Sequence, residues 1–159
     1  MVLTEYTVTS DKLKDNHTLV MLSDFHNVRS VMPEALGVAK FVNPEAILVV
    51  GDLVDRHRKK YDLAVPFLKD CVRLAPTYFS YGNHEKKFPM VSHEELVSTG
   101  AEVFNNTYAK YEFKNGDVFA IGGHYPYTDF DWMSDFENED EFKILLCHHP
   151  EYYERGLKD

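Results

Sequence analysis

Four short clusters in this sequence contain carboxylate, imidazole and amide side chains, the residue types that bind metal ions. Each cluster directly follows an apolar run typical of a buried strand. The clusters are Asp24-Phe25-His26, Gly51-Asp52-Leu53-Val54-Asp55, Gly82-Asn83-His84-Glu85 and His148-His149-Pro150. Because ligands of open α/β sheets bind beyond the carboxyl ends of the strands, we expect the four clusters to converge on one crevice.

The spacing within the clusters has a physical reason. Asp24 and His26 are two residues apart, so in an extended segment both side chains point the same way and can bind one ion. Asp52 has two carboxylate oxygens and can bridge two ions. Gly51 and Gly82 allow sharp turns and a close approach of the backbone. A mixed set of carboxylate, imidazole and amide ligands suits Mn, Fe or Zn ions rather than a thiolate site for a soft metal.

Strand-like runs alternate with helical stretches along the chain, which predicts one α/β domain over residues 1–159. Ser92 and Glu95 have the spacing of a capping box, and Asn115-Gly116 indicates a hairpin. The predicted strands are Tyr6–Thr9, Thr18–Leu22, Ala46–Val50, Thr77–Ser80, Tyr108–Phe113, Val118–Ile121 and Phe142–Cys147. The predicted helices are Val31–Phe41, Leu63–Leu74, a short helix after Ser92 and the beginning of a helix over Pro150–Lys158.

The composition is that of a globular protein, with 44% hydrophobic residues among 159. The sequence contains neither an apolar run long enough to span a membrane nor a secretory signal pattern. Cys71 and Cys147 are too few for a disulfide framework, and we expect both to be buried thiols. We therefore expect a cytoplasmic location, with a trimmed N-terminal anchor as the alternative.

The formal net charge of −9 argues against a nucleic-acid polymer as the partner. Most of this charge comes from residues 129–141, which contain seven acidic residues and no basic one. We favour a solvated loop there over an acidic surface that binds a partner. Trp132, inside this stretch, is either a lip of the substrate site or a hydrophobic anchor for the loop.

The four clusters, in this order, resemble the motifs Asp-x-His, Gly-Asp-x-x-Asp, Gly-Asn-His-Glu and a later strand-borne His of the calcineurin-like metallophosphoesterases. The segments Leu22–Asn27 and Leu146–Pro150 are most similar to the bacterial phosphodiesterase branch of that family. The resemblance spans Ser23 to Pro150. It implies a four-layer α/β sandwich, in which two mixed β-sheets are packed together and flanked by helices.

The resemblance also implies roles for individual residues. The metal ligands would be Asp24 and His26 for the first ion, Asn83 and His148 for the second, and Asp52 as the bridge between the two ions. His84 would stabilise the transition state or protonate the leaving oxygen, and Asp55 and Glu85 would orient their neighbours. A hydroxide between the two divalent ions would attack phosphorus and hydrolyse a phosphodiester or phosphoanhydride bond.

Several assignments leave alternatives open. In related sequences a variable residue separates the ligand from the proline, which favours His148 over His149. Arg56, at the head of the basic run after Asp55, is either a contact for substrate phosphate or part of a solvated turn. His124 either edges the pocket or is structural, and we favour the structural role. His17 and His93 are predicted to lie on the surface.

The chain departs from the family pattern at its end, because Glu151–Asp159 contains no histidine that could complete a Gly-His-x-His motif. We therefore expect a truncated domain that lacks its C-terminal strands, with an incomplete second sheet and each ion one ligand short. An unpaired edge of that sheet would favour self-association. The expected function is a metal-dependent phosphoesterase acting on a small-molecule or lipid-like phosphoester. The alternatives are a non-catalytic binding module of the same fold and an inactive fragment.

Overall fold

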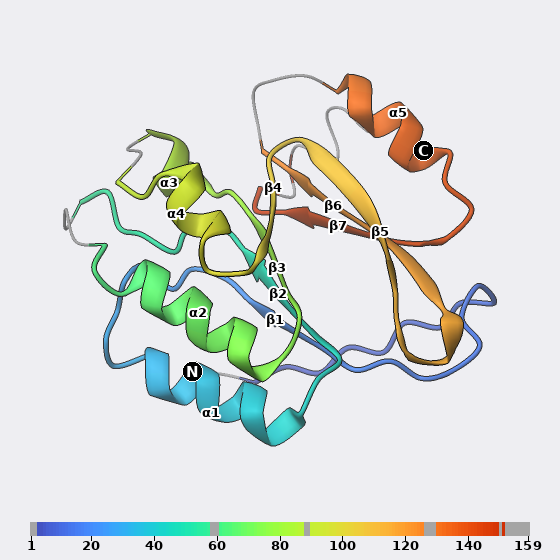
Figure 1. Cartoon of the computed structure of the whole chain (residues 1–159), viewed down its shortest axis with the longest axis horizontal. Coiled ribbons are helices and arrows are strands. Elements are labelled where there is room, and N and C mark those ends of the chain that lie inside the picture. The colour runs from blue at the N-terminus through green and yellow to red at the C-terminus, as the bar shows by residue number, and fades with distance from the viewer. Residues whose placement is uncertain (1–2, 58–60, 88–89, 126–129, 150, 152–159) are drawn as a thin grey trace.

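Two β-sheets pack face to face between layers of helices in the computed structural model (Figure 1), which describes residues 3–57, 61–87, 90–125, 130–149 and 151. The strands of the first sheet, in spatial order, are β1 (Leu19–Leu22), β2 (Ala46–Val50), β3 (Thr77–Ser80) and β4 (Glu102–Phe104). Those of the second are β5 (Thr107–Glu112), β6 (Val118–His124) and β7 (Phe142–Cys147). The helices are α1 (Met32–Val42), α2 (Ala64–Leu74), α3 (Asn83–Lys87), α4 (His93–Val97), α5 (Asp131–Glu137) and the 3₁₀ turn η1 (Lys114–Gly116).

This architecture confirms the predicted two-sheet α/β fold flanked by helices. One detail differs, since the described strands of the first sheet are all parallel, whereas we expected both sheets to be mixed. The second sheet is mixed: β5 is antiparallel to β6, and β6 is parallel to β7. Self-association through an open sheet edge stays a prediction.

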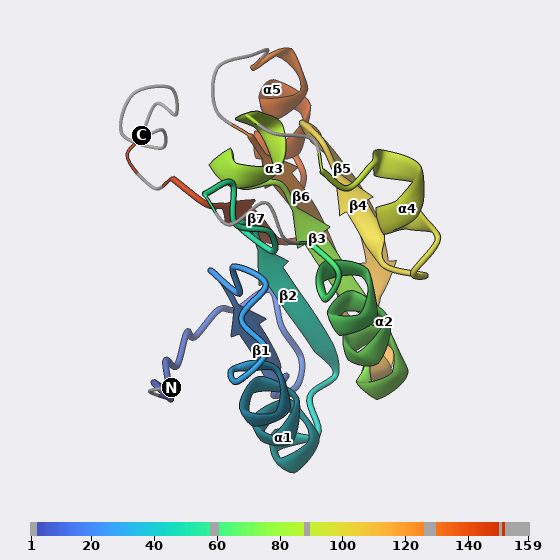
Figure 2. The ribbon, with the colours of Figure 1, turned by 90° about the vertical axis from the view of Figure 1, so that its left-hand side faces the viewer.

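The central strand β2 is buried on both faces because its side chains alternate between two cores. Ile47 and Val49 pack under the helices, and α1 and α2 cover this face of the first sheet (Figure 2). Leu48 and Val50 point the other way and pack between the two sheets, together with Phe119 and Leu146 of the second sheet. The continuous apolar run in the sequence therefore reflects a strand that is covered on both sides.

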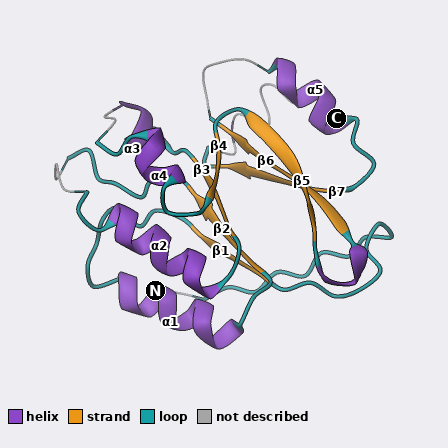
Figure 3. Ribbon diagram, viewed as in Figure 1, coloured by secondary structure: helices purple, strands orange, loops and turns teal. Residues whose placement is uncertain are grey.

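Parallel strands place the following segments at one edge of the sheet, which we call the carboxyl edge. The segments after β1 and β2 are loops, whereas β3 runs almost directly into the single-turn helix α3 (Figure 3). β7 packs against β2 and β3, so its carboxyl end reaches the same place from the second sheet. The four clusters singled out in the sequence therefore meet at this edge.

Other predicted elements agree with the structure. α4 begins with the predicted capping box, because Ser92 Oγ accepts from the Glu95 amide at 3.1 Å and Glu95 Oε2 accepts from the Ser92 amide at 2.8 Å. The predicted strand Tyr6–Thr9 is wrong. These residues form neither helix nor strand, and the side chains of Tyr6 and Val8 are 81% and 71% exposed. The predicted helix over Pro150–Lys158 lies outside the described residues, except for Glu151.

The acidic stretch was predicted to be a solvated loop, and this is also wrong, because its centre forms α5. Met133 and Phe136 lie three residues apart, share one face of the helix and are buried. Trp132 packs on Tyr108 with ring centroids 6.3 Å apart. It also fills the space beside Gly122, where an added Cβ would lie 2.9 Å from the Trp132 ring. Trp132 is thus a hydrophobic anchor for the acidic helix.

His17 was predicted to lie on the surface, but its side chain is only 3% exposed. Its Nδ1 lies 3.0 Å from Glu45 Oε2 and its Nε2 lies 2.9 Å from Asp117 Oδ2. His17 lies two residues before β1, and Glu45 and Asp117 directly precede β2 and β6. We call these three residues the amino-edge cluster. Among the described helices, none combines the length and the apolar composition that a membrane crossing requires.

Candidate metal centre

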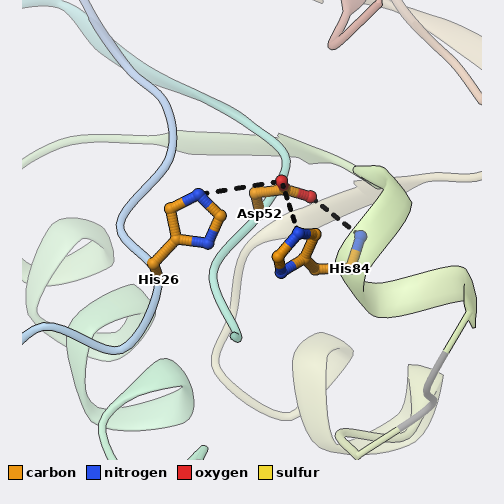
Figure 4. A group of neighbouring side chains, drawn as sticks. All are labelled: His26, Asp52 and His84. Carbon is orange, nitrogen blue, oxygen red and sulfur yellow. Dashed lines mark hydrogen bonds and ion pairs between the residues drawn. The ribbon is translucent and has the colours of Figure 1, made fainter. Parts of the chain in front are cut away.

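The carboxyl edge brings five of the predicted site residues into two overlapping groups. One group is His26, Asp52 and His84, and the other is Asp24, Asp52 and His148. Within each group the potential ligand atoms lie within 4.8 Å of one another. Figure 4 shows the first group, in which the imidazoles of His26 and His84 flank the Asp52 carboxylate. Asp52 belongs to both groups, so its carboxylate lies at the centre of the site. We call these five residues the carboxyl-edge cluster.

The backbone at this edge adopts unusual conformations. Asp24, His26 and Asp52 all have positive φ angles, of 57°, 48° and 55°. Our expectation that Asp24 and His26 lie in an extended segment is therefore wrong. The two loops are held by hydrogen bonds to each other instead, such as the His26 amide to the Asp52 carbonyl at 2.9 Å. Non-glycine residues in the left-handed region cost free energy and concentrate at functional sites.

Gly51 and Gly82 are required by close packing between two loops. A Cβ on Gly51, whose φ is +69°, would lie 2.6 Å from the Gly82 Cα. A Cβ on Gly82 would lie 2.2 Å from Asp52 Oδ1. A larger residue at position 82 would therefore displace the Asp52 carboxylate, and one at position 51 would displace the Gly82 backbone or the His148 ring.

Glu85 holds the backbone around Asp52 in place. It is buried, and its carboxylate accepts from the amides of Asp52 at 2.9 Å, Gly82 at 2.8 Å and Val54 at 3.0 Å. Burial raises the pKa of Glu85, although these backbone hydrogen bonds oppose the shift. Glu85 thus connects the segments that follow β2 and β3.

Two imidazoles have the hydrogen-bonding pattern of metal ligands. His148 Nδ1 lies 2.9 Å from the Val50 carbonyl, and His26 Nδ1 lies 3.3 Å from the Val54 carbonyl. A carbonyl only accepts, so Nδ1 donates in both rings, and Nε2 carries the lone pair in the neutral form of each ring. His148 Nε2 lies 3.2 Å from Asp52 Oδ2, and His26 Nε2 lies 3.4 Å from Asp24 Oδ1. A lone pair that faces a carboxylate oxygen requires a cation between them, which is the arrangement of a metal-binding histidine.

A proton can fill the same role as a metal ion. The hydrogen bond to Asp52 raises the pKa of His148 to about 9. Burial would raise the pKa of Asp52, but hydrogen bonds from His148 and from the His84 amide outweigh it and lower the pKa. The metal-free site therefore holds a proton between these two side chains.

His84 differs from the other two imidazoles. The Arg56 amide donates to its Nδ1 at 3.2 Å, so the proton of the neutral ring is on Nε2. Burial lowers the pKa of His84, which favours the neutral ring. Its Nε2 lies 3.8 Å from Asp52 Oδ2, and its Nδ1 lies 3.9 Å from Asp55 Oδ1. His84 thus presents an N–H group, not a lone pair, to the centre of the site.

Asn83 and His149 form a contact that the sequence did not predict. His149 Nε2 lies 3.0 Å from Asn83 Oδ1, whereas His148 reaches Asp52. The structure therefore assigns the Asp52 contact to His148, the histidine that the sequence favoured. In the sequence, the two consecutive histidines indicated that a second histidine could contact the site, but they did not identify Asn83 as the partner of His149.

The remaining candidates lie around this centre. The Arg56 side chain donates from Nε to His57 Nε2 at 3.0 Å, and the His57 ring lies 5.9 Å from the His84 ring. His124 is buried, and its ring packs 4.9 Å from that of Phe130 and 6.2 Å from that of Trp132. This aromatic environment favours the structural role over the pocket edge for His124, and the assignment stays a prediction.

The donor set fits divalent metal ions. Carboxylate oxygens and imidazole nitrogens are the ligands that Mn, Fe and Zn accept. Asp52 belongs to both groups, and its Oδ2 is the oxygen that the imidazoles of His26, His84 and His148 approach. Because Gly82 has no side chain, the Asp52 carboxylate fits directly against its backbone. The carboxylates of Asp24 and Asp52 and the imidazoles of His26 and His148 could therefore hold divalent metal ions.

Comparisons with known proteins agree with this site. The family model for the calcineurin-like phosphoesterases matches residues 17–159. A Danio rerio protein described as a transmembrane protein with a metallophosphoesterase domain is 32% identical over 98 residues. That match covers 58% of this chain but only 22% of the relative, so the chain spans about a fifth of the relative's length.

Among solved structures, TT1561 of Thermus thermophilus has a similar fold, with a TM-score of 0.58 at 15% sequence identity. The match covers 82% of this chain and 67% of that protein. A second solved structure, with a TM-score of 0.50 and 15% identity, covers the same shares. The family match over most of the sequence, together with the two-sheet fold, shows that this chain belongs to the calcineurin-like phosphoesterase family.

Proposed function

We propose that this chain provides the metal-binding part of a hydrolase that cleaves phosphodiester or phosphoanhydride bonds with two divalent metal ions. The observation that carries the proposal is the central position of Asp52, whose Oδ2 lies 3.9 Å from His26 Nε2 and 3.2 Å from His148 Nε2. Asp24 and His26 would hold the first ion, Asn83 and His148 the second, and Asp52 would bridge them. When bound, the two ions supply a nucleophile at neutral pH and neutralise charge on the phosphoryl group.

The chain's own residues would do the rest of the chemistry. His84 presents its Nε2–H towards the centre of the site, so it would donate this proton to the leaving oxygen or to a developing negative charge. The Arg56 amide maintains the tautomer that this donation requires. Asp55 would orient the segment beside His84, because its Oδ1 accepts from the His57 amide at 2.9 Å. Arg56 and His57 form a polar rim beside His84 that would contact substrate phosphate.

The proposed substrate is a small-molecule or lipid-like phosphoester. The net charge of −9 would repel the backbone of a nucleic-acid polymer but matters less for a small substrate that the ions neutralise. Mn, Fe and Zn all fit the donor set, and Mn²⁺ is the first ion to test.

Calorimetric titration of the metal-free protein with Mn²⁺, followed by hydrolysis of bis(4-nitrophenyl) phosphate, tests the proposal. We expect two bound ions per chain and hydrolysis that depends on both. A non-catalytic binding module of the same fold would need no stoichiometric metal. If no divalent ion binds stoichiometrically, the hydrolase proposal is wrong and the binding module is favoured.

A further inference from the structure

The two consecutive histidines after β7 reach different partners. The rings of His148 and His149 are nearly perpendicular, at 83°, with centroids 5.0 Å apart. His148 contacts Asp52 in the loop after β2, whereas His149 contacts Asn83 at the beginning of α3. Both contacts cross from the second sheet to the first, so β7 supplies one histidine to each neighbouring segment of the site.

His149 is itself held on two further sides. Glu151 Oε1 lies 3.2 Å from His149 Nδ1, on the far side of the ring from Asn83. The Cys147 thiol donates to the His149 backbone carbonyl at 3.3 Å. Burial raises the pKa of Cys147, so this thiol keeps the proton that it donates. The Cys147 thiol therefore fixes the backbone of His149, and the ring of His149 lies between two oxygen acceptors.

The contact with Asn83 has a chemical consequence. An asparagine amide has an oxygen and an NH₂ group of nearly the same shape, and its outer torsion has a broad energy profile. Only the oxygen can bind a cation. An imidazole N–H that donates to this oxygen fixes which way the amide points, and it leaves the second lone pair of the oxygen available.

We propose that His149 is a positioning residue that holds the amide oxygen of Asn83 in place for the second metal ion, an inference that rests on the proposed function. Without this contact, the amide could turn its NH₂ group toward the ion and bind it less well. Partners that orient a metal ligand typically contribute about 10–100-fold to metal affinity. His149 would therefore affect one of the two ions.

Mn²⁺ titration of the metal-free protein by calorimetry tests this inference. We expect His149→Ala to lower the affinity for one of the two ions by about tenfold or more and to leave the affinity for the other unchanged. His149→Gln, whose side-chain amide can still donate to Asn83, should restore most of the affinity. His93→Ala, at the first turn of α4, is the control for loss of a histidine outside the site.

A double mutant distinguishes positioning from direct metal binding. If His149 acts through Asn83, the double variant Asn83→Ala/His149→Ala should bind as weakly as Asn83→Ala alone. Additive losses, or failure of His149→Gln to restore affinity, would overturn the positioning role. Circular dichroism of each variant shows whether it folds.

The contact can also be observed without metal. The side-chain amide signals of Asn83 in ¹H–¹⁵N NMR spectra of the metal-free protein should shift in His149→Ala and stay close to wild type in His149→Gln. If the wild type binds two ions and His149→Ala binds them equally well, the positioning role alone is wrong. If the wild type binds none, the proposed function is wrong and the role in metal binding falls with it.

Discussion

The carboxyl-edge and amino-edge clusters are built from the same residue types but have opposite properties. In the amino-edge cluster both nitrogens of His17 contact carboxylates, and Asp117 Oδ2 also accepts from the Lys14 amide at 2.9 Å. The His17 and Asp117 side chains are 3% and 1% exposed. In the carboxyl-edge cluster, Nε2 of neutral His26 carries a lone pair that faces Asp24 Oδ1 at 3.4 Å, and the Asp24 side chain is 56% exposed. Hydrogen-bond saturation, not residue type, distinguishes a structural cluster from a candidate ligand site.

The largest expected effect is the loss of both metal ions in Asp52→Ala. Asp52 is the proposed bridge and lies next to both His26 and His148, so its removal should lower occupancy at two positions, whereas Asp24→Ala should mainly affect one. Metal analysis of the purified variants checks this. Asp117→Ala is the matched control, because it removes a buried carboxylate from the amino-edge cluster and should keep both ions. Unchanged occupancy in Asp52→Ala would remove the bridging role and the contrast between the clusters.

The second expected effect separates His84 from the ligands within the carboxyl-edge cluster. Because His84 presents an N–H group, His84→Asn should retain both ions and lose about 10²–10⁴-fold in turnover. Hydrolysis rates with 4-nitrophenyl and alkyl esters measure this, and the loss should be smaller for the good leaving group. Metal loss in His84→Asn would show that His84 is a ligand.

The third expected effect lies in the amino-edge cluster. Removing one member of a buried, hydrogen-bonded charge pair typically costs about 3–5 kcal/mol, and we expect a loss of this size in His17→Ala. Urea unfolding measures the free energy of unfolding. His93→Ala, which loses one hydrogen bond to Tyr81, should cost about 1 kcal/mol. Metal content and turnover should stay unchanged in His17→Ala, and their loss would show that the two clusters are coupled.

The smallest expected effect is the pH dependence of stability. Burial lowers the pKa of His17, but hydrogen bonds with Asp117 and Glu45 outweigh it and raise the pKa above 6.5. The stabilisation from this charge is therefore fully present below pH 6.5 and is lost as pH rises through the raised pKa. The hydrogen bond from His17 lowers the pKa of Asp117. The stabilisation from the Asp117 carboxylate is therefore lost only as pH falls below 3.8.

Urea unfolding of the metal-free protein between pH 4 and 9 checks this dependence. As pH rises above 6.5, the free energy of unfolding of the wild type should fall relative to that of His17→Gln. This fall should be smaller than the loss of stability caused by His17→Ala. Taking the difference removes the contribution of His148, whose pKa is raised as well. A difference that does not change with pH would mean that His17 is not held in its charged form.

The parts of the fold that depend on neighbouring residues could be predicted from the sequence. The apolar runs identified β2, β3 and β7, and the carboxyl ends of parallel strands brought Asp24, Asp52, His84 and His148 together. What the sequence did not reveal depends on distant partners. The partners of His17 lie 28 and 100 residues away, and Asn83 lies 66 residues from His149.

Two other differences have local causes that a pattern of residue types does not display. α5 was missed because seven acids dominate residues 129–141 and obscure the spacing of Met133 and Phe136. The left-handed conformations of Asp24, His26 and Asp52 arise where two loops exchange backbone hydrogen bonds. Propensity does not predict them, because each of these residues is free to adopt an extended conformation when isolated.

The three amides that share the Glu85 carboxylate give the site a distinctive order of assembly. The amides of Asp52, Val54 and Gly82 have their hydrogen-bond acceptor on α3, so neither loop is complete until that helix docks. In hydrogen exchange, these amides should open together as one cooperative unit. Their shared opening free energy would report on the formation of the carboxyl edge separately from that of the strands beneath it.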